Sequence, residues 1–207
     1  MARAIVLNAK TVRPSVCNAM DTLLVHSAVA DRFVPMIAEA LAAHDVTLHP
    51  DERALPLSHA APTIAVIPED YDREWLSLDC SVRIVDSLEE AMDHIETHGS
   101  GHSEAIVTES YSAAQRFQRE VDAAAVFVNA STYFNDGGQF GLGCEQPLIH
   151  PRRNHAKDRL RRAAVGSRLP RLQCRPCMTC RLNSNEQRLC LWWASRVAAR
   201  PPRPSPF

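Results

Sequence analysis

The sequence predicts an α/β fold with a largely parallel sheet over residues 1–145, followed by an irregular basic tail over residues 146–207. Short apolar segments alternate with amphipathic segments of about ten to fifteen residues, as in folds built from strand–helix–strand units. The charge also changes sign near residue 145. The first part holds 9 Lys+Arg against 22 Asp+Glu, and the second part holds 14 against 2. Because composition and periodicity change together, we expect a domain boundary there.

The composition is that of an ordinary globular protein. The chain has 207 residues, of which 45% are hydrophobic and 23% are charged, which allows one domain plus an appendage. No run of eighteen apolar residues is present, so no membrane-spanning helix is expected. The first ten residues lack the features of a secretory signal. We therefore expect a cytoplasmic protein whose seven cysteines are reduced thiols.

The first strand–helix pair is predicted near the N-terminus. The apolar run 22–26 has the length of a buried strand, and 28–43 has a helical pattern in which Pro35 either kinks the helix or lies in its first turn. Residues 50–72 are rich in Pro and Asp and predict a loop, with 63–67 as a candidate strand. The helix would bury one face, formed by Val29, Phe33, Ile37 and Leu41.

The next segments repeat the alternation. Residues 81–85 predict a strand, and Ser87 with Glu90 forms the pattern of a capping box that opens a helix to about His98. Residues 104–108 predict another strand.

A third repeat follows. Ser110 or Ser112 is expected to cap a helix to about Val121, and 123–128 is as apolar as a central parallel strand. Residues 135–138 predict a turn.

The tail favours a different chemistry. Residues 146–207 keep no helical or strand period, and the last eight include four prolines, which predicts disorder. Cys174, Cys177, Cys180 and Cys190 have spacings that resemble a metal site, and the arginines suit nucleic acid. The alternative function is therefore a metal- or nucleic-acid-binding module on a non-catalytic α/β domain. Without paired C-x2-C knuckles or interleaved aromatic residues, we expect neither metal nor nucleic acid.

Cys17 is the candidate nucleophile. It lies in residues 8–19, a predicted polar loop before the first strand, with Lys10 and Arg13 as nearby cations. A cation that lowers a thiol pKa makes the thiolate available for covalent catalysis. Most free cysteines are small buried hydrophobes instead, and the position alone leaves both interpretations open.

Three segments resemble the gamma-glutamyl phosphate reductases, members of the aldehyde dehydrogenase superfamily. The first is N-A-K-T, R-P and C-N leading into T-L-L-V-H over residues 8–26, and the second is G-S-G-H-S-E-A-I-V-T over 99–108. The third is V-N-A-S-T with D-G-G-x-F-G-L-G over 128–143. Three matches in order are far more specific than one short motif. The resemblance implies an aldehyde-dehydrogenase-like catalytic domain over residues 1–145.

The resemblance also implies an activity. A reductase of this family uses NADPH to convert L-glutamate 5-phosphate to L-glutamate 5-semialdehyde and phosphate, in proline biosynthesis. Cys17 matches the family nucleophile, which forms a thioester, and the Asn18 side chain is a candidate donor to the oxyanion. Implied partners are the substrate, a possible second copy of the chain and a coupled glutamate 5-kinase.

Other candidate residues carry weaker signals. Asn129, Ser131 and Thr132 follow a predicted strand, where substrate loops of α/β folds lie, and they suit structural roles equally well. Glu74 matches the position of a carboxylate on the nicotinamide ribose. Two further residues, His102 and Phe134, suit hydrogen bonding and packing better than substrate contact.

The chain departs from the family pattern at both ends. The family's N-terminal portion, which supplies most of the dinucleotide-binding domain, has no counterpart, and the resemblance stops just after Glu145. We expect a frameshifted or fused tail and little reductase activity from this chain alone. A non-catalytic interaction protein is the remaining alternative.

Overall fold

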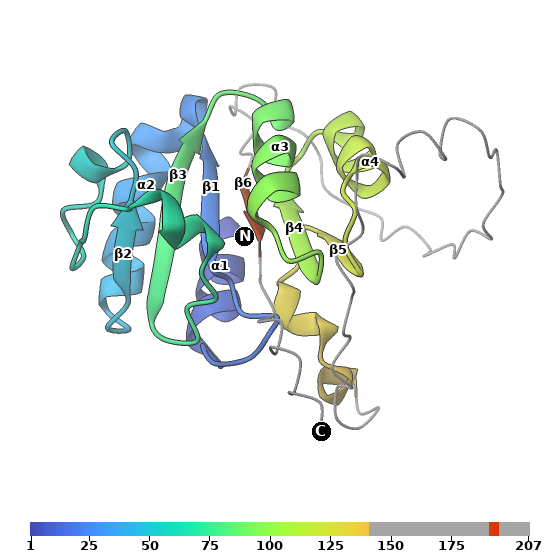
Figure 1. Cartoon of the computed structure of the whole chain (residues 1–207), viewed down its shortest axis with the longest axis horizontal. Coiled ribbons are helices and arrows are strands. Elements are labelled where there is room, and N and C mark those ends of the chain that lie inside the picture. Colours follow the sequence, from blue (N-terminus) through green and yellow to red (C-terminus); the bar gives the residue numbers. More distant parts are fainter. Residues whose placement is uncertain (141–190, 195–207) are drawn as a thin grey trace, which may run out of the picture. The chain divides into compact units, whose positions relative to one another are not determined.

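A computed structural model describes residues 1–140 and 191–194 of the chain (Figure 1). These residues form a six-stranded sheet in the order β2-β3-β1-β6-β4-β5. Neighbouring strands are parallel except that β6 runs antiparallel to both β1 and β4. The strands are β1 (Thr22–His26), β2 (Thr47–Pro50), β3 (Asp79–Val85), β4 (Ser103–Val107), β5 (Ala125–Val128) and β6 (Leu191–Ala194). The predicted α/β class with a largely parallel sheet is confirmed.

Helices cover both faces of the sheet, and Figure 1 shows α3 in front of it. The described residues form four α-helices, α1 (Ala2–Thr11), α2 (Ser27–Ala42), α3 (Leu88–His98) and α4 (Tyr111–Glu120). Short 3-10 turns are η1 (Leu55–Leu57), η2 (Pro68–Asp72), η3 (Thr132–Asn135) and η4 (Gly137–Phe140). This layered arrangement explains why several strands are apolar on both faces.

Strand β1 shows the two cores directly. Leu23 and Val25 pack in the core that contains α1 and α2, whereas Leu24 packs in the core that contains α3 and α4. Successive side chains of a strand point to opposite faces, so a continuous apolar run is what this central strand requires. The predicted strand at 22–26 is confirmed.

The predicted helices are confirmed, with changes at their ends. His26 begins α2 by accepting from the Ala28 N–H at 3.1 Å, and Pro35 lies inside this helix rather than in its first turn. Ser87 accepts from the Glu90 N–H at 3.1 Å, as a capping residue of α3 does. Of the two serines proposed to cap α4, Ser110 is the N-cap.

Three sequence expectations before the tail were wrong. Asn8–Thr11 belongs to α1 rather than to a loop, because Ala9 and Lys10 are buried on the inner face of that helix. Strand β2 (Thr47–Pro50), which precedes the predicted loop 50–72, was not predicted at all. Residues 63–67 form no strand, although Ile64 and Val66 donate backbone hydrogen bonds to Leu48 and Pro50 of β2. Strand β5 is at the sheet edge, not at its centre.

The fourth correction concerns the tail. Residues 191–194 form β6, which pairs with β1 on one side and β4 on the other. An irregular tail was expected there because four residues carry no periodic signal of their own. Backbone pairing with β1 and β4 stabilises their strand conformation, and each of these strands has β6 as its partner on that side. The remainder of the proposed tail lies outside the described residues.

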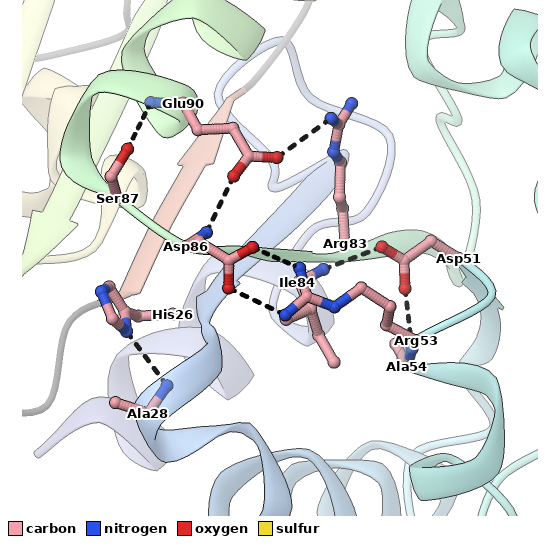
Figure 2. A network of polar contacts seen from close by, with 10 residues as sticks. All are labelled: His26, Ala28, Asp51, Arg53, Ala54, Arg83, Ile84, Asp86, Ser87 and Glu90. Carbon is pink, nitrogen blue, oxygen red and sulfur yellow. Dashed lines mark hydrogen bonds and ion pairs between the residues drawn. The ribbon is translucent and has the colours of Figure 1, made fainter.

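A polar network joins the carboxyl ends of β2 and β3 to α3 (Figure 2). The Asp51 carboxylate accepts from the N–H groups of Ala54 at 2.7 Å and Ile84 at 3.0 Å. Arg53 donates two 2.8 Å bonds to Asp86, whose own N–H donates to the Glu90 carboxylate at 2.8 Å. These carboxylates are engaged in holding loops in place, so this end of the sheet is a structural junction.

Candidate active site

Cys17 lies in a turn between α1 and β1, five residues before β1 begins. The Ala19 N–H donates to the Val16 carbonyl at 3.0 Å, and the Met20 N–H donates to the Ala9 carbonyl at 3.0 Å. These bonds fix the loop at the C-terminal end of α1. The Cys17 residue is partly exposed, so solvent reaches the loop that carries the thiol.

Cys80 is the useful contrast. It is fully buried on β3, and burial raises the pKa of its thiol to about 12. A thiol with so high a pKa is protonated at neutral pH and unreactive. Of the two cysteines within the described ranges, only Cys17 is placed to act as a nucleophile.

Asn18 follows Cys17 in the sequence. Its side chain is fully buried, yet neither its amide nitrogen nor its amide oxygen has a hydrogen-bond partner among the described residues. A buried amide left unsatisfied costs about 1–3 kcal/mol, and such groups in folded proteins call for an explanation. A donor held without a partner next to a nucleophile is suited to a reacting carbonyl oxygen.

Thr132 connects the segment after β5, which contains the candidates Asn129, Ser131 and Thr132, to the Cys17 loop. Its fully buried hydroxyl donates to the Asn18 carbonyl at 2.6 Å. Ser131 is also buried, and its hydroxyl accepts from the Tyr133 N–H at 3.2 Å, which caps η3. The loop after β5 is therefore packed beside the Cys17 loop.

Asn129 has a positioning role in this structure. Its side chain accepts from the Thr108 N–H at 2.9 Å and donates to the Thr108 carbonyl at 3.0 Å. Its φ of +56° lies in the left-handed region that Asn tolerates better than most residues. The residue thus turns the chain at the end of β5, and its amide is already occupied.

The two cations near the thiol have different environments. Lys10 is fully buried, and desolvation lowers the pKa of its ammonium group, although Cys80 and Asp21 favour the charged form. Its Nζ has no hydrogen-bond partner within the described part of the chain. Arg13 is exposed in the loop itself. Only the second cation can meet a ligand that approaches from solvent.

The three remaining candidates are Glu74, His102 and Phe134. Glu74 is half-buried, and the N–H of the next residue, Trp75, donates to Asp21 at 3.2 Å. His102 is buried, with its Nδ1 at 2.5 Å from the Ser103 hydroxyl. Phe134 is 44% exposed.

Glu104 is a notable residue that sequence reasoning did not single out. It is fully buried on β4, and its two carboxylate oxygens have no hydrogen-bond partner among the residues described. Desolvation, with a smaller contribution from Asp21, raises the pKa of this carboxyl group well above its ordinary value. The one available signal was an acidic residue inside an otherwise apolar strand.

The described residues contain no group of three His, Cys, Asp or Glu side chains placed to hold a metal ion. The four cysteines considered as metal ligands, Cys174, Cys177, Cys180 and Cys190, lie outside those residues. No helix in the described ranges is long and apolar enough to cross a membrane.

The curated proteins that resemble this chain include gamma-glutamyl phosphate reductases. The gamma-glutamyl phosphate reductase of Serratia marcescens is 53% identical over 146 residues, which are 70% of this chain and 35% of the relative. That of Cutibacterium acnes is 53% identical over 145 residues, 70% of this chain and 34% of the relative. No family model matches the chain. The chain spans about a third of the length of these relatives.

Solved structures agree with the sequence relatives. The gamma-glutamyl phosphate reductase of Thermotoga maritima superposes with a TM-score of 0.66 at 42% identity, covering 72% of this chain and 37% of that one. The enzyme of the same name from Saccharomyces cerevisiae gives a TM-score of 0.52 at 31% identity, covering 72% and 39%. The fold is therefore aldehyde-dehydrogenase-like, and over about 70% of its length the chain is similar to gamma-glutamyl phosphate reductases.

Proposed function

We propose that the described domain carries out the cysteine chemistry of an acyl phosphate reductase, acting on L-glutamate 5-phosphate in proline biosynthesis. The observation that carries the proposal is the position of Cys17. The thiol-bearing loop is partly exposed and contains Asn18, whose buried amide has no hydrogen-bond partner among the described residues. The loop is also tied to the segment after β5 by Thr132.

In the first half-reaction, the Cys17 thiolate attacks the carbonyl carbon of the acyl phosphate. The electron pair of the acyl carbon–oxygen bond leaves with the phosphate, and a thioester remains on the sulfur. The backbone N–H of Cys17 and the side-chain N–H of Asn18 are the proposed donors to the oxyanion of the tetrahedral intermediate. Asn129 and Ser131 act indirectly, because they shape the loop that presents Thr132 to Asn18.

The second half-reaction needs a reductant, and the family implies NADPH, which when bound would supply a hydride. Reduction of the thioester would release L-glutamate 5-semialdehyde and return the Cys17 thiolate. Among the described residues, we propose Glu74 as the contact to the nicotinamide ribose of NADPH. The observation in favour is that Glu74 precedes Trp75, which is bonded to Asp21, four residues from the thiol. This segment therefore lies along the same end of β1 as Cys17.

The surroundings of the reaction follow from the same proposal. We propose a cytoplasmic enzyme, assembled as a homo-oligomer, that receives its labile acyl phosphate from a coupled glutamate 5-kinase. The division into a catalytic domain over residues 1–145 and a basic tail belongs to the proposal as well.

The first half-reaction tests the proposal without a cofactor. We expect L-glutamate 5-phosphate to release about one equivalent of phosphate per chain in a burst, and to leave a glutamyl adduct on the peptide that contains Cys17. The Cys17→Ser variant should show neither, whereas Cys80→Ser, altered at the buried thiol, should keep both. An adduct on another residue, or none on the folded wild-type protein, would overturn the proposal.

A further inference from the structure

Arg13 is an exposed cation in the loop that carries the nucleophile, and the part of the chain that the structure describes supplies no ion-pair partner for it. We propose that the Arg13 guanidinium binds the phosphate group of the acyl phosphate and so selects a phosphorylated acyl donor. The inference rests on the proposed function and adds the residue that recognises the leaving group.

Most cations of the described domain are already engaged. Those of Arg53, Arg73, Arg83 and Arg116 are paired with carboxylates, and Arg119 donates to Gln115. Lys10 is fully buried and cannot reach a ligand in solvent. These engaged or buried groups are therefore not candidates for binding a phosphate dianion.

Three exposed arginines remain in the described ranges, namely Arg3, Arg13 and Arg32. Arg3 lies in the first turn of α1, and Arg32 lies on α2, which follows the carboxyl end of β1. Only Arg13 belongs to the loop between α1 and β1, four residues from the thiol. That loop is anchored by backbone bonds at Ala9 and Val16, so Arg13 is held within the same segment as Cys17.

The chemistry at this position requires a cation. The domain is acidic, with 9 Lys+Arg against 22 Asp+Glu over residues 1–145, and its average field repels a doubly charged phosphate. A planar guanidinium forms two parallel hydrogen bonds to phosphate oxygens and is always charged. It also stabilises the negative charge that develops on the leaving oxygen as the acyl carbon–oxygen bond breaks.

The test compares two donors of the same acyl group. L-glutamate 5-phosphate carries a doubly charged phosphate, and the 5-(p-nitrophenyl) ester of L-glutamate carries an uncharged aryl group that leaves as p-nitrophenolate. We expect Arg13→Gln to slow acylation of Cys17 by the phosphate donor about 10- to 100-fold, which corresponds to one charge-assisted hydrogen-bonding contact. Acylation by the ester should change less than about twofold, since the thiol and the oxyanion donors are intact.

Two further variants sharpen the comparison. Arg13→Lys keeps the positive charge but cannot form two parallel hydrogen bonds to the phosphate, and it should retain part of the acylation rate with the phosphate donor. Arg32→Gln removes the same charge from α2 and should leave both rates unchanged. Equal slowing of both donors by Arg13→Gln, or no slowing of either, would overturn the role of Arg13 while leaving the nucleophile in place. A wild-type protein that neither donor acylates would overturn the proposed function itself.

Discussion

The hydroxyl of Thr132 donates a 2.6 Å hydrogen bond to the carbonyl of Asn18, joining residues 114 positions apart in the chain. Both residues are fully buried. This bond connects the loop after β5 to the loop that carries Cys17, and it explains how two separate sequence motifs contribute to one site.

Removing that hydroxyl should loosen the site. We expect Thr132→Val to lower the free energy of unfolding by about 1–3 kcal/mol, because the buried Asn18 carbonyl loses its donor. Thr132→Ser keeps the hydroxyl and is the matched control, with a smaller loss from the missing methyl group. Urea unfolding measures the stability, and the rate of Cys17 alkylation at fixed pH reports on the loop. Equal stability of the Val and Ser variants would show that the bond contributes nothing.

Glu104 should make the stability of the domain fall as the pH rises. Burial raises the pKa of its carboxyl group in the folded protein. The pKa in the unfolded chain is about 4.3, so at a pH between these two values the native state binds one proton that the unfolded state does not. The stability that this proton contributes is fully present below the unfolded-state pKa, and it is lost as the pH rises through the folded-state pKa.

The variant Glu104→Gln should remove this dependence. We expect it to match the wild-type protein near pH 4 and to exceed it at pH 9 by about 1 kcal/mol or more, since one pKa unit corresponds to 1.36 kcal/mol. Urea midpoints measured across this range provide the comparison. Glu109→Gln, at an exposed position after β4, is the control. Parallel pH profiles for wild type and Glu104→Gln would show that Glu104 is not held protonated.

The N-cap of α3 makes a separate contribution. Ser87→Ala removes the side chain that accepts from the Glu90 N–H at 3.1 Å, and we expect it to cost about 1 kcal/mol of stability. Ser112→Ala, on the exposed surface of α4, should cost less than about half of that. Thermal or urea unfolding separates the two, and an equal loss from both substitutions would contradict the capping role.

Sequence patterns correctly predicted the helices and strands that are determined by residues close together in the chain. The strand at 22–26, the helix that contains Phe33 and the capped helix after Ser87 each follow from periodicity or a capping residue. The Cys17 position in a loop before a strand was also visible in the sequence.

The rest depends on contacts between distant residues. Strand β2 is short and contains His49, whose Nε2 lies 3.0 Å from the Asp79 carboxylate of the neighbouring strand. Lys10 looked like a solvent-facing loop cation, and only the packing of α1 against the sheet shows it to be buried. Asn129 suited a substrate contact and a structural role equally well in the sequence, and its amide is occupied by the backbone of Thr108. No single-sequence pattern specifies such partners.

The pH dependence of alkylation at Cys17 tests the central claim most directly. Iodoacetamide modification followed by peptide mass analysis resolves Cys17 from Cys80 and from the cysteines outside the described residues. If Cys17 is activated, its alkylation rate should reach half of its maximum at a pH well below the unperturbed thiol pKa of about 8.5. Cys80 should stay unmodified in the folded protein. A Cys17 midpoint at or above that value, or modification only after unfolding, would contradict the account.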